Sequence, residues 1–408
     1  MNESQVSSKI IIVDDNQFQL KLLSHQLSMV GYKSVTAFDD GQTALNHMET
    51  QNLDSTIVIL DLNMPNMDGI EFLQKLKEAK FSGALLLVSG EDESVLQSAE
   101  TLASSYNLLV LGHLSKPVQQ EQLQKYLNYF SARKEEILQP AKEYNYSAER
   151  LRQAIETGEL SNVYQPKVLL GTGELMGVEA LVRWEHPDDG EIFPDQFINL
   201  AEENDLIDEI ARQVLRNALI DNKIWKEFGI DITVAVNISM YNLSTREFIS
   251  NLESELLSSG VSPQNLILEV TESKLMQDYS LVLDMLTRLR LRRVNLSIDD
   301  FGTGHSSMAQ LRDLPFNELK IDRGFVHSAC DNETLHGIFD GSMQLAKNLG
   351  IKTVAEGVET EADWSFLGNS DCDVAQGFFI GKPMKARELA AWRDQWTQRY
   401  AKMAIPSE

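Results

Sequence analysis

Polar and charged side chains recur near the ends of the strand-like apolar runs in the last two-thirds of the sequence. They are Gln165, Glu179, Asn237, Glu269, Asp299 with Asp300, Lys320 with Asp322, Glu356 and Gln376. Burying an isolated carboxylate is costly, so this repeated placement indicates a shared site rather than chance. If the runs are strands of one barrel, their ends form one rim, and a ring of acids lines it.

Such a ring needs cations to offset the repulsion between its carboxylates. Carboxylate and amide oxygens suit Mg²⁺ or Mn²⁺ better than zinc. Two such ions, about 3.5–4 Å apart, favour in-line attack of water on a phosphorus atom. They would also attract an anionic substrate to a chain whose net charge is −25. Asp299 and Asp300 would point to opposite faces of a regular strand, so both reach the ions only if the strand end bends.

A second acidic cluster is expected near the N-terminus. Asp14 and Asp15 end one apolar run and Asp61 ends another, and parallel strands end at one edge of a sheet. Three converging carboxylates predict a divalent cation. Ser89 and Lys116 follow two further runs, and they offer the hydroxyl and ammonium that a phosphorylated carboxylate would need as partners. A single acid at a strand end is more often a turn former or helix cap, so the prediction depends on the whole set.

The first third of the chain alternates strand-like and helical patterns. The predicted strands are Lys9–Val13, Ser34–Ala37, Ile57–Leu60, Ala84–Val88 and Leu108–Leu111, and the predicted helices are Phe18–Val30, Gly41–Glu49, Ile70–Lys77, Ser94–Ser104 and Gln119–Phe130. Continuous apolar strands between amphipathic helices predict a parallel sheet covered on both faces. Charges and Pro140 break the pattern over residues 131–146, which we interpret as a linker with room for helix at its start.

A larger alternating unit begins at about Ser147. Its strand-like runs are Asn162–Val168, Gly177–Trp184, Ile232–Ile238, Leu266–Thr271, Val294–Asp299, Glu318–Ile321, Lys352–Glu356 and Val374–Ile380, and its main helical patterns are Asp195–Phe228, Tyr279–Arg292, Leu335–Leu349 and Ala386–Tyr400. About eight such units in roughly 260 residues favour a (β/α)₈ barrel of parallel strands. An open doubly wound sheet is the alternative at this level.

The composition excludes several classes of protein. With 36 basic against 61 acidic residues, the surface repels nucleic acid polymers and anionic lipid. No apolar run approaches the roughly 20 residues that span a bilayer, so no membrane insertion is expected. Two cysteines give no disulfide framework, and no apolar segment of a signal peptide follows the N-terminus. We therefore expect a cytoplasmic protein.

Residues 8–130 resemble the receiver domain of bacterial response regulators, which is a flavodoxin-like (βα)₅ fold. The resemblance implies that Asp61 is the phosphoacceptor and that Asp14, Asp15 and the backbone carbonyl of Asn63 hold Mg²⁺. It also implies that Ser89 and Lys116 are the switch residues, that the Lys116–Pro117 bond is often cis, and that a cognate histidine kinase or phosphotransfer protein is a partner. His113 departs from the family pattern, which usually has an aromatic residue there.

The later motifs resemble those of bacterial EAL domains, the cyclic di-GMP phosphodiesterases. They are Tyr164-Gln165-Pro166, Glu179-Ala180-Leu181, Asn237-Ile238-Ser239, Glu269-Val270-Thr271-Glu272-Ser273, Asp299-Asp300-Phe301-Gly302-Thr303-Gly304, Leu319-Lys320-Ile321-Asp322, Ala355-Glu356-Gly357-Val358-Glu359-Thr360 and Ala375-Gln376-Gly377-Phe378. The resemblance covers about residues 148–400 and indicates an EAL domain over 147–402. It implies a TIM-like barrel whose first strand is antiparallel, which corrects the all-parallel prediction.

The same resemblance implies an activity and a role for each site residue. The activity is hydrolysis of cyclic di-GMP to linear pGpG by a two-metal mechanism, modulated by phosphorylation of the receiver. The implied metal ligands are Glu179, Asn237, Glu269, Asp299 and Asp300; Lys320, Glu356 and Gln376 are catalytic; Gln165, Leu181, Arg183, Asp322 and Pro383 bind substrate; and Glu272 anchors the loop Asp300–Ser307. Glu356 is either the general base or a ligand of the second metal. The family often forms dimers, so a homo-oligomer is expected.

Alternative interpretations remain open at this point. Taken alone, Lys320 is more often a surface lysine whose stem covers apolar residues. Trp184 either packs against helices or forms a wall of the nucleotide pocket, and His305 stands where the family commonly has tyrosine. At the level of function, the rivals are a catalytically silent cyclic di-GMP receptor that signals through a protein partner and a DNA-binding regulator. No basic helix-turn-helix segment is left over for the latter.

Overall fold

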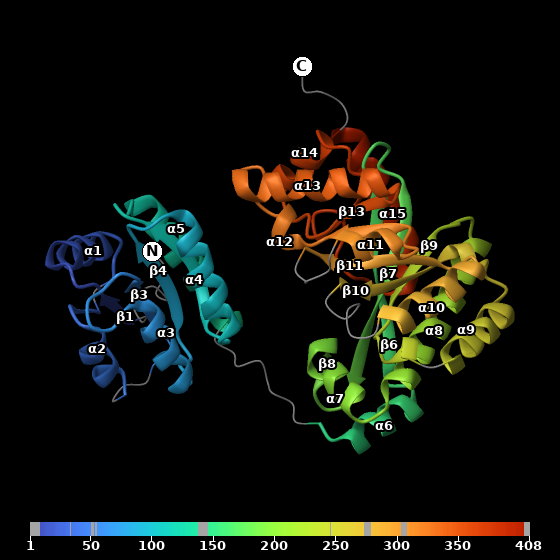
Figure 1. Ribbon diagram of the computed structural model, residues 1–408, viewed down its shortest axis with the longest axis horizontal. Coiled ribbons are helices and arrows are strands. Elements are labelled where there is room, and N and C mark those ends of the chain that lie inside the picture. Colours follow the sequence, from blue (N-terminus) through green and yellow to red (C-terminus); the bar gives the residue numbers. More distant parts are fainter. Residues whose placement is uncertain are drawn as a thin grey trace. The chain divides into compact units, whose positions relative to one another are not determined.

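The computed structural model describes residues 9–32, 34–49, 53, 55–137, 146–244, 246–272, 279–302 and 308–403 (Figure 1). The contacts divide the chain into two units, Met1–Glu143 and Tyr144–Glu408. None of the helices in the described part of the chain combines the length and apolar character that a bilayer span requires. His305 lies outside the described residues.

The N-terminal unit is a five-stranded parallel sheet in the order β2-β1-β3-β4-β5. Its elements are β1 (Lys9–Val13), α1 (Gln17–Met29), β2 (Val35–Phe38), α2 (Gly41–Met48), β3 (Thr56–Asp61), α3 (Gly69–Glu78), β4 (Ala84–Ser89), α4 (Glu93–Ser105), β5 (Leu109–Ser115) and α5 (Gln120–Ile137). This strand order is that of flavodoxin-like folds. The predicted (βα)₅ architecture is confirmed.

Side chains of β1 show why the sheet is covered on both faces. Ile10 and Ile12 pack with residues of α1 and α5. The alternate residues Ile11 and Val13 pack with residues of α2, α3 and α4. Because successive side chains of a strand point to opposite faces, an unbroken apolar run fits a sheet with helices on both sides.

The second unit is a closed barrel with helices around it. Its elements are α6 (Ala148–Thr157), β6 (Leu160–Leu169), β7 (Leu175–His186), β8 (Gly190–Ile192), η2 (Pro194–Gln196), α7 (Ile198–Glu203), α8 (Ile207–Glu227), β9 (Thr233–Asn237), η3 (Asn242–Ser244), α9 (Arg246–Ser259), η4 (Pro263–Asn265), β10 (Leu266–Thr271), α10 (Tyr279–Leu291), β11 (Asn295–Phe301), α11 (Met308–Asp313), β12 (Glu318–Ile321), α12 (Arg323–Val326), α13 (Glu333–Leu349), β13 (Lys352–Ala355), α14 (Glu361–Gly368), β14 (Val374–Gln376), η6 (Ala386–Glu388) and α15 (Leu389–Met403).

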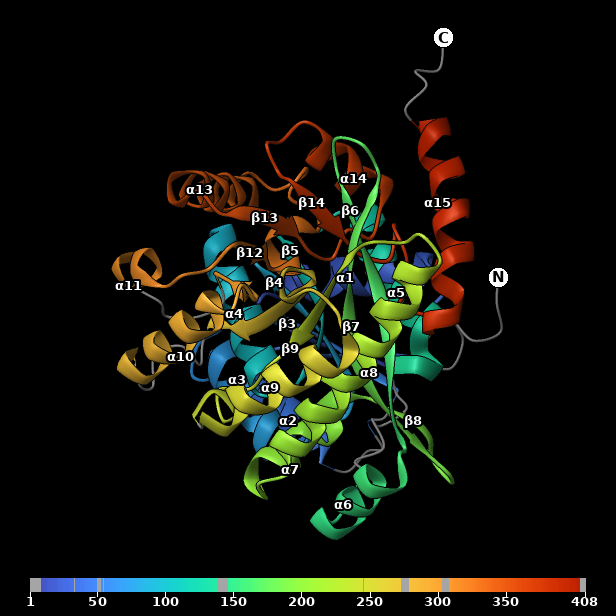
Figure 2. The same cartoon turned by 90° about the vertical axis from the view of Figure 1, so that its right-hand side faces the viewer.

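The barrel closes between β6 and β7, and β6 is antiparallel to both of its neighbours, β14 and β7. The other neighbouring pairs of the barrel are parallel. The all-parallel prediction is therefore wrong for the first strand, as the family resemblance indicates. The β6–β7 ribbon continues past the barrel toward β8 (Figure 2).

Several elements differ from the predicted ranges, and β5, for example, runs to Ser115, four residues past the predicted end at Leu111. The pattern over Asp195–Phe228 is divided into η2, α7 and α8, because Asp205 has a left-handed backbone (φ 58°) that ends a helix while the apolar spacing continues. The strand at Val374 ends at Gln376, since Gly377 packs directly against the backbone of Val358. Helix α5 runs on to Ile137, so the first part of the segment 131–146 is helical.

Candidate active site

Every strand of the barrel contributes a polar side chain to one end of it. The contributors are Gln165 on β6, Glu179 on β7, Asn237 on β9, Glu269 on β10, Asp299 on β11, Lys320 on β12, Glu356 directly after β13 and Gln376 on β14. Gln165 and Glu179 are paired in register but lie within their strands rather than at the ends, because β6 and β7 extend beyond the rim. The predicted ring of side chains from distant parts of the sequence is thus assembled by the fold.

Glu179 is held on both of its carboxylate oxygens. Asn237 donates its Nδ2 hydrogen to Oε1 over 2.6 Å, and Gln376 donates from Nε2 to Oε2 over 2.6 Å. Nε2 of Gln376 also lies 3.1 Å from Oε1 of Gln165. These hydrogen bonds orient Glu179 and link four strands around it.

Lys320 lies at the centre of the acids with only 1 % of its surface exposed. Its Nζ is 2.9 Å from Glu269, 2.8 Å from Asp299, 2.8 Å from Glu356 and 3.6 Å from Glu179. The interpretation of Lys320 as a surface lysine is therefore wrong. An ammonium group here offsets carboxylate charge at the point where the ring converges.

A second buried lysine, Lys167, was missed by the sequence analysis. Its Nζ lies 2.5 Å from Oε1 of Glu269 and 3.5 Å from Oε1 of Glu318, and 1 % of the residue is exposed. The signal was present, because Lys167 is two residues from Gln165 and Glu318 is two residues from Lys320. Residues two apart on a strand share a face, so both should have been predicted to point inward.

Asp299 and Asp300 are brought together by an irregular strand end. Asp300 has a left-handed backbone (φ 54°), and the register of β11 with β12 shifts between Ile298 and Phe301. As a result, Asp299, Asp300 and Glu356 each place a carboxylate oxygen within 4.8 Å of the others. The bend that the adjacent aspartates required is present.

Burial and charge shift the pKa values of the ring in opposite directions. Burial alone would raise the pKa of Glu179, but Lys320, Lys167 and the two amide hydrogen bonds lower it to about 2. Burial raises the pKa of Glu269 to about 7 against the effect of the two lysines. Burial also raises the pKa of Glu356 to about 8 against the effect of Lys320, and the nearby Asp299 and Glu179 raise it as well. Burial and the nearby Asp299 raise the pKa of Asp300 to about 6.

The remaining predicted residues lie around this ring. Leu181 lines a cavity of about 330 Å³ that also includes Asn237. Asp322 accepts a hydrogen bond from the backbone N–H of Gly324 over 2.8 Å and so caps the short helix α12. Pro383 is half-buried next to Met384, whose backbone pairs with Tyr164.

Two further predicted residues have neighbours that bear on their roles. The Gly302 N–H donates to Glu272 over 2.8 Å, at the start of the loop for which Glu272 is the expected anchor; residues 303–307 of that loop lie outside the described residues. Trp184 is fully buried in the core and donates to Glu159 over 2.8 Å. The interpretation of Trp184 as a pocket wall is wrong, and it packs instead.

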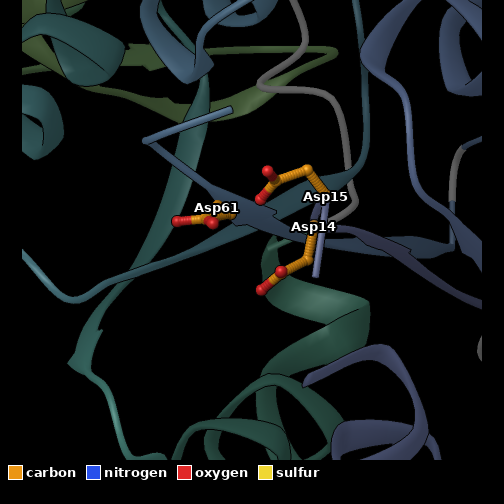
Figure 3. Close-up of side chains that lie close together, drawn as sticks. All are labelled: Asp14, Asp15 and Asp61. Atoms are coloured by element: carbon orange, nitrogen blue, oxygen red, sulfur yellow. The ribbon is translucent and has the colours of Figure 1, made fainter. Parts of the chain in front are cut away.

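The acids of the N-terminal unit also converge. Asp14 and Asp15 follow β1 and Asp61 ends β3, so that the three side chains lie at adjacent strand ends (Figure 3). Nζ of Lys116 is 2.7 Å from an oxygen of Asp14 and 2.7 Å from an oxygen of Asp61. Burial raises the pKa of Asp61 despite this lysine. The Lys116–Pro117 bond is cis.

Other predicted receiver residues surround this cluster. The Asn63 N–H lies 3.3 Å from Oδ1 of Asp61, and its side chain donates to Glu91 over 2.9 Å. The Ser89 hydroxyl is buried and accepts a hydrogen bond from the Glu91 N–H over 3.2 Å. His113, at the position of the usual aromatic residue, lies 2.6 Å from Glu100 on α4.

Both clusters fit divalent cations by the chemistry of their donors. Two groups of acids, Asp14 with Asp15 and Asp61, and Asp299 with Asp300 and Glu356, converge closely enough to hold an ion. Hard oxygen donors of this kind suit Mg²⁺ or Mn²⁺. In the barrel, two lysines face six carboxylates, so further positive charge is needed.

Comparison with known proteins agrees with this architecture. The family model for the EAL domain matches residues 148–383, and that for the response regulator receiver domain matches residues 10–128. The chain belongs to the EAL domain family and carries a receiver domain at its N-terminal side. Phosphodiesterases of this family are metal-dependent.

Relatives share either the whole arrangement or the barrel alone. The cyclic di-GMP phosphodiesterase RocR of Pseudomonas aeruginosa is 31 % identical over 92 % of this chain and 96 % of its own length. The bifunctional diguanylate cyclase/cyclic di-GMP phosphodiesterase MucR of the same organism is 44 % identical over 59 % of this chain, which spans only 35 % of MucR. The solved structure of the MucR phosphodiesterase with c-di-GMP matches 59 % of this chain and 98 % of that one, with a TM-score of 0.57.

Proposed function

We propose that this protein is a response regulator that hydrolyses cyclic di-GMP to linear pGpG with two Mg²⁺ or Mn²⁺ ions. The observation that carries the proposal is the closed set of contacts among Glu179, Asn237, Glu269, Asp299, Lys320, Glu356 and Gln376. A catalytically silent receptor has no need for an intact ring of acids around a buried lysine. The names of RocR and MucR, which are phosphodiesterases, support the same substrate.

The ring residues divide into ligands and groups that act on the substrate. Glu179, Asn237, Glu269 and Asp299 would hold one ion, and Asp300 would reach the second. When bound, the ions supply an activated water and charge stabilisation at phosphorus. Lys320 is within hydrogen-bond distance of three of the acids, and its fixed charge would stabilise the negative charge that develops on the phosphoryl group.

Two polar groups complete the reaction site. Gln376 is held between Glu179 and Gln165, so it can orient water or substrate. Glu356 has a pKa raised to about 8, which suits a general base near neutral pH. If Glu356 instead holds the second ion, that ion would keep it ionised. Gln165, Leu181, Arg183, Asp322 and Pro383 would contact the nucleotide around this centre, and Glu272 would anchor the loop that begins at Asp300.

The receiver would control this reaction by phosphorylation of Asp61. Asp14, Asp15 and the carbonyl of Asn63 would hold Mg²⁺ beside it, while Ser89 and Lys116 would contact the phosphoryl group. The phosphodonor would be a histidine kinase or phosphotransfer protein. We place the protein in the cytoplasm, where such donors act, and expect a homo-oligomer.

The test is a turnover assay of the full chain with cyclic di-GMP and Mg²⁺ or Mn²⁺, with and without beryllofluoride, followed by chromatography of the products. We expect pGpG, no product in EDTA, and a rate that changes with beryllofluoride. Glu179→Ala should lower turnover by about 10²-fold or more, because outer-shell changes alone cost 10–100-fold, while circular dichroism stays the same.

Outcomes that oppose the proposal are distinct. Binding of cyclic di-GMP without formation of pGpG would favour the silent receptor. Full turnover by Glu179→Ala would contradict its assignment as a ligand. Sedimentation of the same samples reports the oligomeric state.

A further inference from the structure

Phe193 is an exposed aromatic residue directly beside a predicted substrate residue. It follows β8, and 49 % of its surface is accessible. The guanidinium carbon of Arg183 lies 4.8 Å from the centre of the Phe193 ring. Arg183 itself is buried, and two of its nitrogen atoms have partners in the protein. Its Nη1 donates to the carbonyl of Val182 over 2.8 Å, and its Nε lies 3.7 Å from Glu191. Arg183 therefore covers one face of the ring, while nearly half of the residue remains accessible.

The strand register places this pair on the face of the ribbon that carries the catalytic acids. Trp184 is opposite Ile192 across β7 and β8, and both are buried in the helix-side core. Arg183 precedes Trp184 on β7, and Phe193 follows the last residue of β8 with its backbone still extended, so both face the other way. Glu179 and Leu181 alternate onto that same face of β7. The aromatic ring of Phe193 thus lies on the same surface of the ribbon as Glu179.

The spacing along this surface is that of a nucleotide. Glu179 and Arg183 are four residues apart on β7, which is roughly 13 Å. A ribose and a purine attached to a phosphate near Glu179 bridge a separation of this size. A cavity of about 330 Å³ lies beside β7, and its lining includes Leu181, Asn237 and Pro194, the residue that follows Phe193.

We propose that Phe193 is a specificity-determining residue, on which one guanine of the dinucleotide stacks opposite Arg183. This inference rests on the proposed function. Contact between Phe193 and the guanine would let the protein distinguish cyclic di-GMP from a phosphodiester that has no nucleobase. A ring fixed on one side by a guanidinium and open on the other offers a flat platform to a purine, because base–aromatic stacking requires only two accessible π-faces. Arg183 then remains next to the adjacent phosphate, where its planar fork can bind it.

The experiment compares Phe193→Ala with the wild-type full chain on two substrates, cyclic di-GMP and bis(p-nitrophenyl) phosphate, which has no nucleobase. We expect KM for cyclic di-GMP to rise about tenfold in Phe193→Ala, with a smaller change in kcat. The ratio of kcat/KM for the two substrates should fall by about the same factor. Phe193→Trp should keep this ratio close to the wild-type value, since a larger aromatic side chain stacks at least as well.

Phe228→Ala is the matched control, because Phe228 is 78 % exposed just after α8 and contributes to no part of the site. In Phe228→Ala, the ratio of kcat/KM for cyclic di-GMP to kcat/KM for bis(p-nitrophenyl) phosphate should equal that of the wild type. An equal loss on both substrates in Phe193→Ala, or failure of Phe193→Trp to restore the ratio, would overturn the inference by showing a purely structural role. A wild-type protein that leaves cyclic di-GMP intact would instead refute the proposed function, so the two failures are distinguishable.

Discussion

The two acidic clusters of this protein solve the same electrostatic problem in different surroundings. In the receiver, one lysine, Lys116, bridges Asp14 and Asp61, and its side chain retains 17 % exposure. In the barrel, Lys320 is in contact with four acids, and a second lysine, Lys167, lies beside one of them with almost no exposure. The two clusters thus differ in the exposure of their lysines, because Asp14 and Asp61 are themselves buried, with 2 % and 4 % of their side chains exposed.

This difference indicates where chemistry and stability are coupled. A substitution in the receiver cluster should change phosphorylation and leave the fold intact, because Asp15 is exposed and Lys116 is partly so, which leaves the cluster open to solvent on one side. A substitution in the barrel ring should change activity and stability together, since an unpaired buried charge is costly. The predictions below test this contrast, beginning with the largest effect.

Asp61→Asn should abolish labelling of the full chain by radioactive acetyl phosphate. The side chain keeps its shape but loses the carboxylate that we propose as the phosphoryl acceptor, and the thermal transition should hardly move. Asp68→Asn is the control: Asp68 is exposed and caps α3 through the Glu71 N–H, so this variant should still be labelled. Labelling that persists in Asp61→Asn would mean that another residue is the acceptor.

Lys320→Ala should lower kcat by about 10²–10³-fold, the usual cost of removing one group that stabilises a developing charge. The proposed metal ligands remain, so calorimetry should still detect Mn²⁺ binding. Lys347→Ala removes an exposed lysine that pairs with Asp371 and should leave kcat unchanged. A wild-type rate for Lys320→Ala would exclude Lys320 from the reaction.

Lys167→Met should lower kcat/KM by about 10–100-fold. This is the usual cost of removing a residue that orients a metal ligand without touching the metal, and Lys167 contacts the proposed ligand Glu269. The change leaves Glu318 and one oxygen of Glu269 without their buried cation, so the melting temperature should also fall. The double variant Lys167→Met/Glu318→Gln no longer has the unpaired charge of Glu318. Its melting temperature should therefore lie between those of Lys167→Met and the wild type. If the single variant melts and turns over like the wild type, the buried pair has no role in the site.

The sequence predicted which acidic side chains meet at each site better than how deeply they are buried. Acids at strand ends sufficed to place Asp61 next to Asp14 and to bring Glu269, Asp299 and Glu356 together, because strand topology alone controls which ends meet. Lys167 was missed because only its spacing of two residues from Gln165 marks it as facing inward, and its acidic partner lies far away in the sequence. Its contact with Glu269 joins residues that are 102 positions apart.

Boundaries of elements were least predictable where backbone conformation overrides periodicity. The apolar spacing of α7 and α8 is continuous, and only the left-handed conformation of Asp205 separates them. The left-handed conformation of Asp300 has the opposite consequence, because it turns two adjacent acids toward one site. The turn at Asp205 is local, since the Leu206 N–H donates to the carbonyl of Ala201 over 2.9 Å, but a left-handed residue other than glycine is not recognised from a periodic pattern.

The smallest expected effect is a pH dependence that distinguishes the barrel from the receiver in metal-free protein. Asp300, Glu269 and Glu356 have pKa values raised to about 6, 7 and 8, above the values of about 4 in an unfolded chain. Between pH 4.5 and 8 the folded barrel therefore binds more protons than the unfolded chain, and its stability falls as pH rises. Glu179, with a pKa lowered to about 2, loses its stabilising effect only below this range.

In EDTA, the melting temperature of the barrel should thus decrease from pH 5 to pH 9, by roughly 2–4 °C for each kcal/mol lost. Saturating Mn²⁺ should flatten the curve, because a cation at the ring favours the ionised carboxylates at every pH. The Asp61→Asn variant serves as the comparison, since it alters only the receiver and should keep the same slope. A metal-free barrel that becomes more stable toward pH 9 would show that the two lysines already neutralise the ring, and the need for added cations would disappear.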